Sequence, residues 1–261
     1  DKLPKKKLSN FDGKDHWFTL DVQIEIEIIK KFIEKQNDEK LQVLYKTILS
    51  SLTNKFSNQD SETRYVSVEK KFIKWSFVNE FKTKVLKYLA IYSFINIPNN
   101  NYENIHTLDL VNDILPIDNN SIDLVITSPP YANTMDYYLY HKQRMNILDF
   151  DFKKVQQAEI GSRHEYSSKK ENKQKWFEDF QITLSKISEK VKDKGEMIFV
   201  IGDSQIAGEL VDASEMVKIS AKNLKLSFEV LESYPMAGRS RYFNKAFQAK
   251  NKHEHILKLT K

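Results

Sequence analysis

The sequence predicts an α/β protein in which a helical region precedes a partly built, doubly wound sheet that ends in an antiparallel hairpin. Helical apolar spacing dominates the first hundred residues. Beyond them, strand-like runs flank an amphipathic stretch, at residues 123–127, 176–191, 196–201, 227–234 and 254–259. We therefore expect a helical region over residues 1–100 and a sheet-forming region over residues 101–261.

Composition limits the class of protein without naming it. The 261 residues are 40% hydrophobic, which is enough for a core, and the net charge of +5 permits a polyanionic partner without requiring one. Cysteine is absent, which excludes disulfides, thiolate metal sites and a cysteine nucleophile. No apolar run approaches the ~20 residues that cross a bilayer, and no signal-peptide pattern opens the chain. We expect a soluble, cytoplasmic protein.

The helical region should contain a helix that starts near Thr19 and two more over residues 41–56 and 69–95. The polar loop at residues 57–65 contains Arg64 and Tyr65. That pair could contact a phosphate and a base, or it could belong to a turn that caps a helix. The sequence leaves both interpretations open.

The sheet-forming region should begin with a short strand at residues 104–109 that ends in Asp109. Ligands of open α/β sheets bind beyond the carboxyl ends of strands, so this carboxylate could accept from a ligand amine, although a helix N-cap competes. The next strand, at 123–127, is apolar enough to be covered on both faces. Ser128-Pro129-Pro130-Tyr131 stops it in a stiff, extended turn, which could hold acceptors and an aromatic ring against a flat, amine-bearing ring.

Three later segments carry basic side chains. A helix expected over residues 137–148 contains Lys142 and Arg144, which could reach phosphates. Residues 152–175 read as a mobile loop over the site that includes Arg163. Arg239 and Arg241 lie in a basic turn and could contact phosphates or an extruded base; solvated surface is the competing interpretation for this turn and for Arg163.

Several segments resemble amino-directed DNA methyltransferases in the same order along the chain: Ser128-Pro-Pro-Tyr131, Ala132 to Lys142, Glu159-Ile-Gly-Ser-Arg163, Gly195 to Asp203 and Lys252-His-Glu-His-Ile-Leu257. The resemblance implies a partial Rossmann-like methyltransferase sheet and S-adenosylmethionine as cofactor. It implies catalytic roles for Ser128, Pro129, Pro130 and Tyr131, and cofactor contacts from Asp109, Leu110 and Ser128. The expected DNA contacts are Arg64, Tyr65, Asn133, Lys142, Arg144, Arg163, Arg239 and Arg241.

The implied reaction moves a methyl group to an exocyclic amine of a base flipped out of double-stranded DNA. Serine at the first motif position favours cytosine N4 over adenine N6 within the families that the chain resembles. No metal is expected, since His253-Glu254-His255 is the nearest thing to a ligand cluster. Two alternatives stay open: a non-catalytic DNA-binding or specificity subunit of a restriction-modification complex, and a methyltransferase acting on RNA or protein.

One expected feature is missing from the sequence. Enzymes of this kind hold the methionine part of the cofactor over a glycine-rich turn, because only glycine lets the backbone approach so closely. The six glycines here stand at positions 13, 161, 195, 202, 208 and 238, and no two of them are separated by a single residue. We expect a second polypeptide to supply that segment, with a truncated, inactive piece as the alternative.

Overall fold

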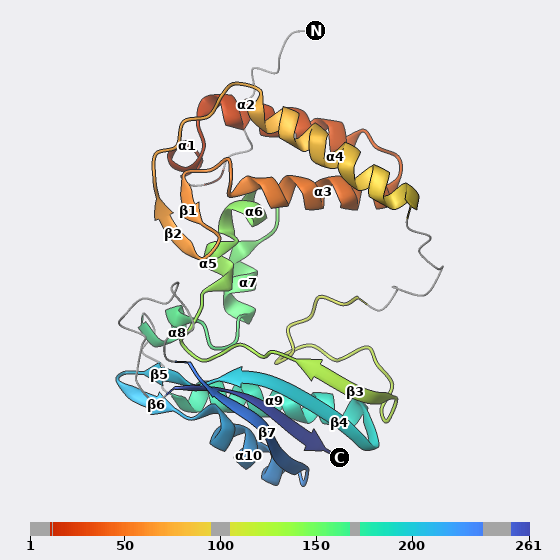
Figure 1. The fold of residues 1–261 in the computed structure, drawn as a ribbon, viewed down its shortest axis with the longest axis vertical. Helices are drawn as coiled ribbons and strands as arrows, with labels where there is room; N and C mark the ends of the chain where they lie inside the picture. The colour runs from red at the N-terminus through yellow and green to blue at the C-terminus, as the bar shows by residue number, and fades with distance from the viewer. Residues whose placement is uncertain (1–10, 12, 95–104, 168–172, 237–251) are drawn as a thin grey trace. The chain divides into compact units, whose positions relative to one another are not determined.

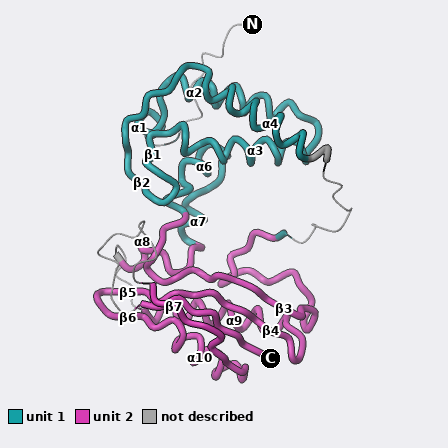
Figure 2. Tube along the Cα trace, viewed as in Figure 1, with its two compact units in different colours: residues 1–105, 138–157 teal, residues 106–137, 158–261 magenta. Residues whose placement is uncertain are grey.

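The computed structural model describes residues 11, 13–94, 105–167, 173–236 and 252–261, which form two compact units (Figure 2). Unit 1 comprises residues 1–105 and 138–157; unit 2 comprises residues 106–137 and 158–261. Unit 1 is thus discontinuous in sequence, whereas the sequence predicted a single division near residue 100. Within the described ranges, no helix is both long enough and apolar enough to cross a membrane.

Unit 1 is built mainly from three helices that share one apolar core (Figure 1): α2 (Leu20–Glu34), α3 (Glu39–Thr53) and α4 (Ser76–Phe94). Asp38 caps α3, accepting from the N–H groups of Lys40 at 2.8 Å and Leu41 at 3.2 Å. Shorter helices complete the helical content of this part of the chain: α1 (Lys14–Trp17), α5 (Tyr137–Tyr140), α6 (Lys142–Ile147) and α7 (Phe152–Ala158). The three long helices α2, α3 and α4 all lie within the stretch whose spacing predicted helices.

Two local expectations in unit 1 were wrong. The polar segment 57–65 is not a loop, because it forms a hairpin of β1 (Gln59–Ser61) and β2 (Arg64–Ser67). The third helix starts at Ser76 rather than residue 69. A side chain of α2 caps the start of this helix. The buried Glu25 carboxylate accepts from the N–H groups of Trp75 at 2.8 Å and Val78 at 2.9 Å.

Unit 2 contains a mixed sheet of four strands in the order β3-β4-β8-β7, namely β3 (Ile122–Thr127), β4 (Val191–Gly202), β8 (His253–Thr260) and β7 (Ser227–Pro235). β3 runs parallel to β4, and β8 runs antiparallel to both β4 and β7. The α/β class and the terminal antiparallel pair are therefore confirmed. The remaining elements are α8 (Arg163–Ser167), α9 (Lys173–Lys190), β5 (Ser204–Ile206), β6 (Glu209–Val211) and α10 (Ala213–Asn223).

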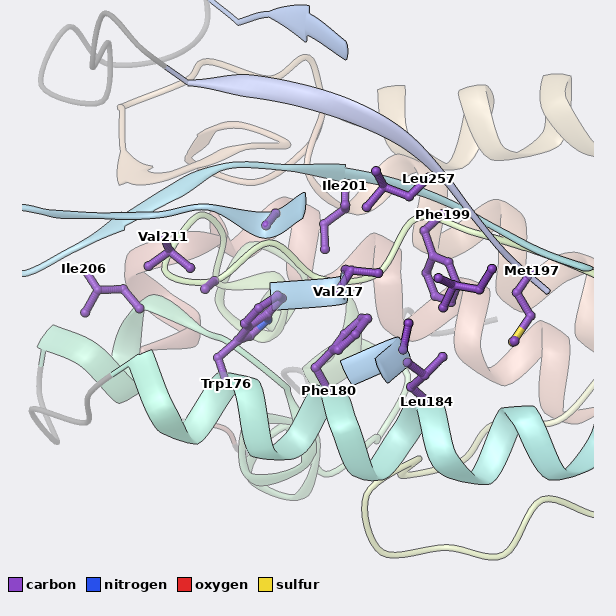
Figure 3. Close-up of a cluster of buried hydrophobic side chains, with 14 of the residues drawn as sticks. Trp176, Phe180, Leu184, Met197, Phe199, Ile201, Ile206, Val211, Val217 and Leu257 are labelled. Atoms are coloured by element: carbon purple, nitrogen blue, oxygen red, sulfur yellow. The ribbon is translucent and has the colours of Figure 1, made fainter. Parts of the chain in front are cut away.

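The core of unit 2 lies between this sheet and the helices α9 and α10. Trp176, Phe180 and Leu184 of α9 point toward the side chains of alternate β4 residues (Figure 3). Those β4 residues are Met197, Phe199 and Ile201, all at most 2% exposed. Every second residue of β4 thus packs against residues spaced four apart on α9, on one face of the sheet.

The strand β3 is less buried than its sequence predicted. Leu124 is 50% exposed and Ile126 is 71% exposed, whereas Val125 packs against the core. The expectation of a strand covered on both faces was therefore wrong. Within the described residues, β3 pairs only with β4, and the core with α9 and α10 covers only one face.

Two further expectations, for residues 104–109 and 152–175, were also wrong. Residues 105–109 form no strand, because Asp109 begins a turn instead. The presumed loop from 152 onward contains the helices α7 and α8 and the start of α9. Side chains tie parts of this segment down, since Glu159 accepts from the Tyr137 N–H at 2.7 Å and Asp136 accepts from the His164 N–H at 3.0 Å.

Candidate functional site at the carboxyl end of the sheet

The turn that follows β3 is held from two sides. The indole Nε1 of Trp176, on α9, donates to the carbonyl of Pro130 at 3.1 Å. Asn133 Nδ2 donates to the carbonyl of Gln205, in β5, at 2.7 Å. Two prolines and two hydrogen bonds therefore fix the backbone, while the Ser128 side chain stays exposed.

Tyr131 lies across the end of the neighbouring strand. A Cβ atom on Gly202 would lie 2.8 Å and 3.0 Å from the ring atoms Cε2 and Cδ2 of Tyr131, so the ring packs against this glycine. The Tyr131 hydroxyl donates to Glu254 Oε1, on β8, at 2.9 Å, and the Ser128 side chain lies close enough to lower the pKa of Tyr131. Burial, together with Glu254, raises the pKa of Tyr131 to about 12 against the lowering effect of Ser128, so the hydroxyl is neutral near pH 7.

Sequence reasoning missed Asp203, which follows β4 as Ser128 follows β3. Its buried carboxylate accepts from the N–H groups of Ala213 and His253, each at 2.9 Å, and lies 3.2 Å from His255 Nε2. His255 Nδ1 in turn lies 2.8 Å from Ser233 Oγ. The available signal was a carboxylate directly after a strongly apolar strand.

The neighbourhood of Asp203 offers ligand atoms that already have partners. Asp203, Asp212 and His255 each bring one such atom within 4.8 Å of the others. Asp203 accepts from backbone N–H groups, and both ring nitrogens of His255 have partners. We therefore assign this cluster to holding β4, β8 and the start of α10 together.

Only some of the features expected of a cofactor site occur among the described residues. Oδ1 of Asp109 accepts from the N–H groups of Val111 at 3.0 Å and Asn112 at 3.2 Å, and Oδ2 accepts from Asn112 Nδ2 at 2.8 Å. These hydrogen bonds and the nearby Lys186 lower the pKa of Asp109, although its partial burial acts the other way. Leu110 follows in the same turn. For cofactor contacts the described residues thus offer the turn after β3. The Asp109 carboxylate is engaged within its own turn, and no closely spaced pair of glycines occurs among these residues.

Four expected DNA contacts come together in unit 1. Arg64 is exposed, with a long ion pair to Asp60 at 3.5 Å. Lys142 Nζ lies 4.4 Å from the centroid of the Phe152 ring. The other two, Tyr65 and Arg144, have partners within the unit.

Tyr65 packs its ring 4.6 Å from that of Trp17, and its hydroxyl accepts from Gln143 Nε2 at 3.1 Å. Arg144, whose side chain is 22% exposed, pairs with Glu62. Burial raises the pKa of Tyr65 against the lowering effect of Gln143. Of this group, Arg64 is the exposed cation, whereas Arg144 is paired with Glu62 and the Lys142 ammonium lies over the Phe152 ring. Arg163 is partly exposed on α8, and Arg239 and Arg241 lie outside the described residues.

The fold and the site together define a mixed α/β protein whose strand-end turn presents hydrogen-bond acceptors beside an aromatic ring. The model of the DNA methylase family, that of N6 and N4 methyltransferases, matches residues 122–261, more than half of the chain. The chain therefore belongs to this family.

Comparison with solved structures adds little to the family match. Native and selenomethionine crystals of a predicted DNA modification methylase from Thermus thermophilus align at 14% and 15% identity, with TM-scores of 0.34 and 0.29. The alignments cover 60% and 58% of this chain and 52% and 49% of that one, so the chain spans about half of the protein that it matches. Similarity this low carries no inference about function. No curated protein matches the sequence.

Proposed function

We propose that this chain is the catalytic and target-reading part of a site-specific DNA methyltransferase. It would transfer a methyl group from S-adenosylmethionine to an exocyclic amine of a flipped base, with cytosine N4 favoured over adenine N6. The observation that carries the proposal is the Ser128–Tyr131 turn, which is held rigidly at the carboxyl end of β3 inside the region matched by the DNA methylase family.

The residues of the turn have distinct roles in this proposal. Ser128 Oγ and the Pro129 carbonyl accept hydrogen bonds from the target amine, which raises electron density on its nitrogen and fixes its direction of approach. Tyr131 stacks on the base, which must leave the duplex because its amine is otherwise paired. The cofactor, when bound, supplies an electrophilic methyl group. Neither a covalent enzyme intermediate nor a metal ion is needed.

In this proposal the exposed cations bind the DNA phosphates, and not all eight expected DNA contacts take part equally. Arg64 is the best candidate for a phosphate contact because it is exposed, with Lys142 as a further candidate although its ammonium lies over the Phe152 ring, whereas Arg144 is paired with Glu62. Phosphate contacts carry no base specificity, so they would position unit 1 on the duplex. Asn133, Arg163, Arg239 and Arg241 remain proposed contacts.

We further propose that a second polypeptide carrying the glycine-rich segment completes the cofactor site. The support is β3 itself: within the described residues it pairs only with β4, and Leu124 and Ile126 are exposed on the face away from the core although the strand is apolar. An added strand would pair with the open edge, and a segment packed on that face would cover the two side chains. Calorimetric titration of S-adenosylmethionine into the chain alone, and into the chain with a co-purifying partner, tests this. Tight binding by the chain alone would contradict it, and Ile126→Lys should abolish the assembly.

The function itself is tested by transfer of a tritiated methyl group from the cofactor to duplex DNA, with mass spectrometry to distinguish N4-methyldeoxycytidine from N6-methyldeoxyadenosine. Ser128→Ala should lower the rate on the order of a hundredfold or more while DNA binding is retained. Ser227→Ala is the matched control, because this exposed serine lies at the opposite end of the sheet. DNA binding without methylation by the assembled wild type would favour the specificity-subunit alternative, and methylation of RNA in place of DNA would redirect the substrate class.

A further inference from the structure

Glu254 holds the motif tyrosine although it lies 123 positions further along the chain. The register between β4 and β8 places Glu254 opposite Gly202, the glycine against which the Tyr131 ring packs. The ring is therefore fixed at two points: its edge atoms lie against the Gly202 backbone, and its hydroxyl lies 2.9 Å from Glu254 Oε1. Within the described part of the chain, no cation forms an ion pair with this carboxylate.

The carboxylate dictates the direction of the hydrogen bonds that reach Ser128. An ionised carboxylate only accepts, so the Tyr131 hydroxyl must donate to Glu254. The Tyr131 oxygen is then left to accept, and the nearby Ser128 hydroxyl, which lowers the pKa of Tyr131, can act as its donor. Because a serine hydroxyl has one hydrogen, its use toward Tyr131 leaves the lone pairs of Ser128 Oγ available as acceptors.

We propose that Glu254 is a positioning residue for methyl transfer, which orients the Ser128–Tyr131 pair so that Ser128 presents an acceptor to the target amine. The inference rests on the proposed function and extends it to a residue outside the Ser-Pro-Pro-Tyr turn. Glu254 does not touch the base or the methyl donor. It acts through Tyr131. Because the Ser128 O–H is turned toward Tyr131, the hydrogens of the target amine meet acceptor oxygens rather than a competing donor.

The variant Glu254→Gln separates this role from a merely structural tie. Glutamine keeps the length of the side chain and can still accept from Tyr131, but its NH₂ group can also donate, so the direction is no longer imposed. A structural tie predicts wild-type activity for Glu254→Gln. The positioning role predicts a fall in kcat on the order of tenfold with the KM for DNA unchanged.

The kinetic experiment uses the chain together with its co-purifying partner and includes a double-mutant cycle. Glu232→Gln, an exposed residue of β7, is the matched control and should retain wild-type kcat. In a Tyr131→Phe background, which removes the hydroxyl link, Glu254→Gln should add less than about twofold. Wild-type kcat for Glu254→Gln, or full additivity with Tyr131→Phe, would overturn the proposal.

An infrared measurement tests the hydrogen-bond direction without any turnover. The C–O stretching band of ¹³C-labelled tyrosine distinguishes a hydroxyl that donates from one that does not, and the wild type minus Tyr131→Phe spectrum isolates Tyr131. We expect a donor band that shifts in Glu254→Gln. An unshifted band would overturn the inference. If the wild type shows this band yet methylates no DNA, the proposed function fails and the contact stands, so the two failures are distinguishable.

Discussion

The indole nitrogen of Trp176 donates to the carbonyl of Pro130 across 3.1 Å, so a helix that packs the core also holds the turn after β3. Trp176 is 1% exposed and stacks on Phe180, with ring centroids 5.3 Å apart. A change in the core is therefore felt directly at the candidate site.

We expect Trp176→Phe to impair methyl transfer as well as stability. The variant keeps an aromatic ring but loses the donor to Pro130 and leaves a small cavity, which together should cost about 1–3 kcal/mol. Urea unfolding and the methylation rate measure the two effects. Trp17→Phe in unit 1 is the control, because it should cost stability and leave the rate per folded molecule unchanged. Equal rates for both variants would contradict the link.

We expect Gly202→Ala to displace the Tyr131 ring. The added Cβ would lie 2.8 Å from a ring carbon, closer than real side chains approach, so the free energy of unfolding should fall by about 1–3 kcal/mol and methylation should fall with it. In a Tyr131→Ala background the same change should cost almost nothing, since the clash is gone. Denaturant unfolding of the four proteins measures this, and an undiminished cost in that background would show that another contact is responsible.

We expect Asp203→Asn to be strongly destabilising. Asparagine has one acceptor oxygen in place of two, so one of the buried donors of Ala213, His253 and His255 loses its partner, at a cost of about 1–3 kcal/mol. Asp212→Asn is the matched control: this exposed residue caps α10, and asparagine caps helices as well as aspartate does. Equal midpoints in urea for the two variants would argue against the role assigned to Asp203.

We expect stability to decline at high pH partly because of Tyr131. Its folded pKa is raised to about 12, so the folded state keeps a proton that the unfolded state releases above about pH 10. The contribution is complete below about pH 10 and is lost as the pH rises toward about 12. Unfolding of wild type and Tyr131→Phe at about pH 8.5 and 10.5 measures it. The free energy of unfolding of the wild type minus that of the variant should fall as the pH rises, and an increase would contradict the prediction.

We expect Arg64→Ala and Arg144→Ala to act on different properties. Arg64 is exposed, so its loss should weaken DNA binding for all sequences and reduce the salt dependence by about one counterion. Arg144 is paired with Glu62, so its loss should mainly destabilise unit 1. Fluorescence anisotropy at several salt concentrations and thermal unfolding separate the two. The assignment fails if Arg144→Ala alone changes the salt slope.

The sequence by itself determined the local features of this protein. The apolar run before Ser128 and the two prolines after it placed a strand and a rigid turn, because strand propensity and the fixed φ of proline act over a few residues. Helical spacing likewise placed α2, α3, α9 and α10. The residues of the candidate turn could therefore be named from the order of amino acids alone.

Only the tertiary structure decided which distant residues meet that turn. Glu254 reaches Tyr131, and Gly202 makes room for its ring, because β8 inserts beside β4 in one particular register. Packing within unit 1 pairs Arg144 with Glu62, and the strand order of unit 2 leaves Leu124 and Ile126 exposed on an end strand. Such outcomes depend on strand order and on which faces are covered. Neither is encoded in the spacing of nearby residues, since each is set by contacts between segments far apart in the chain.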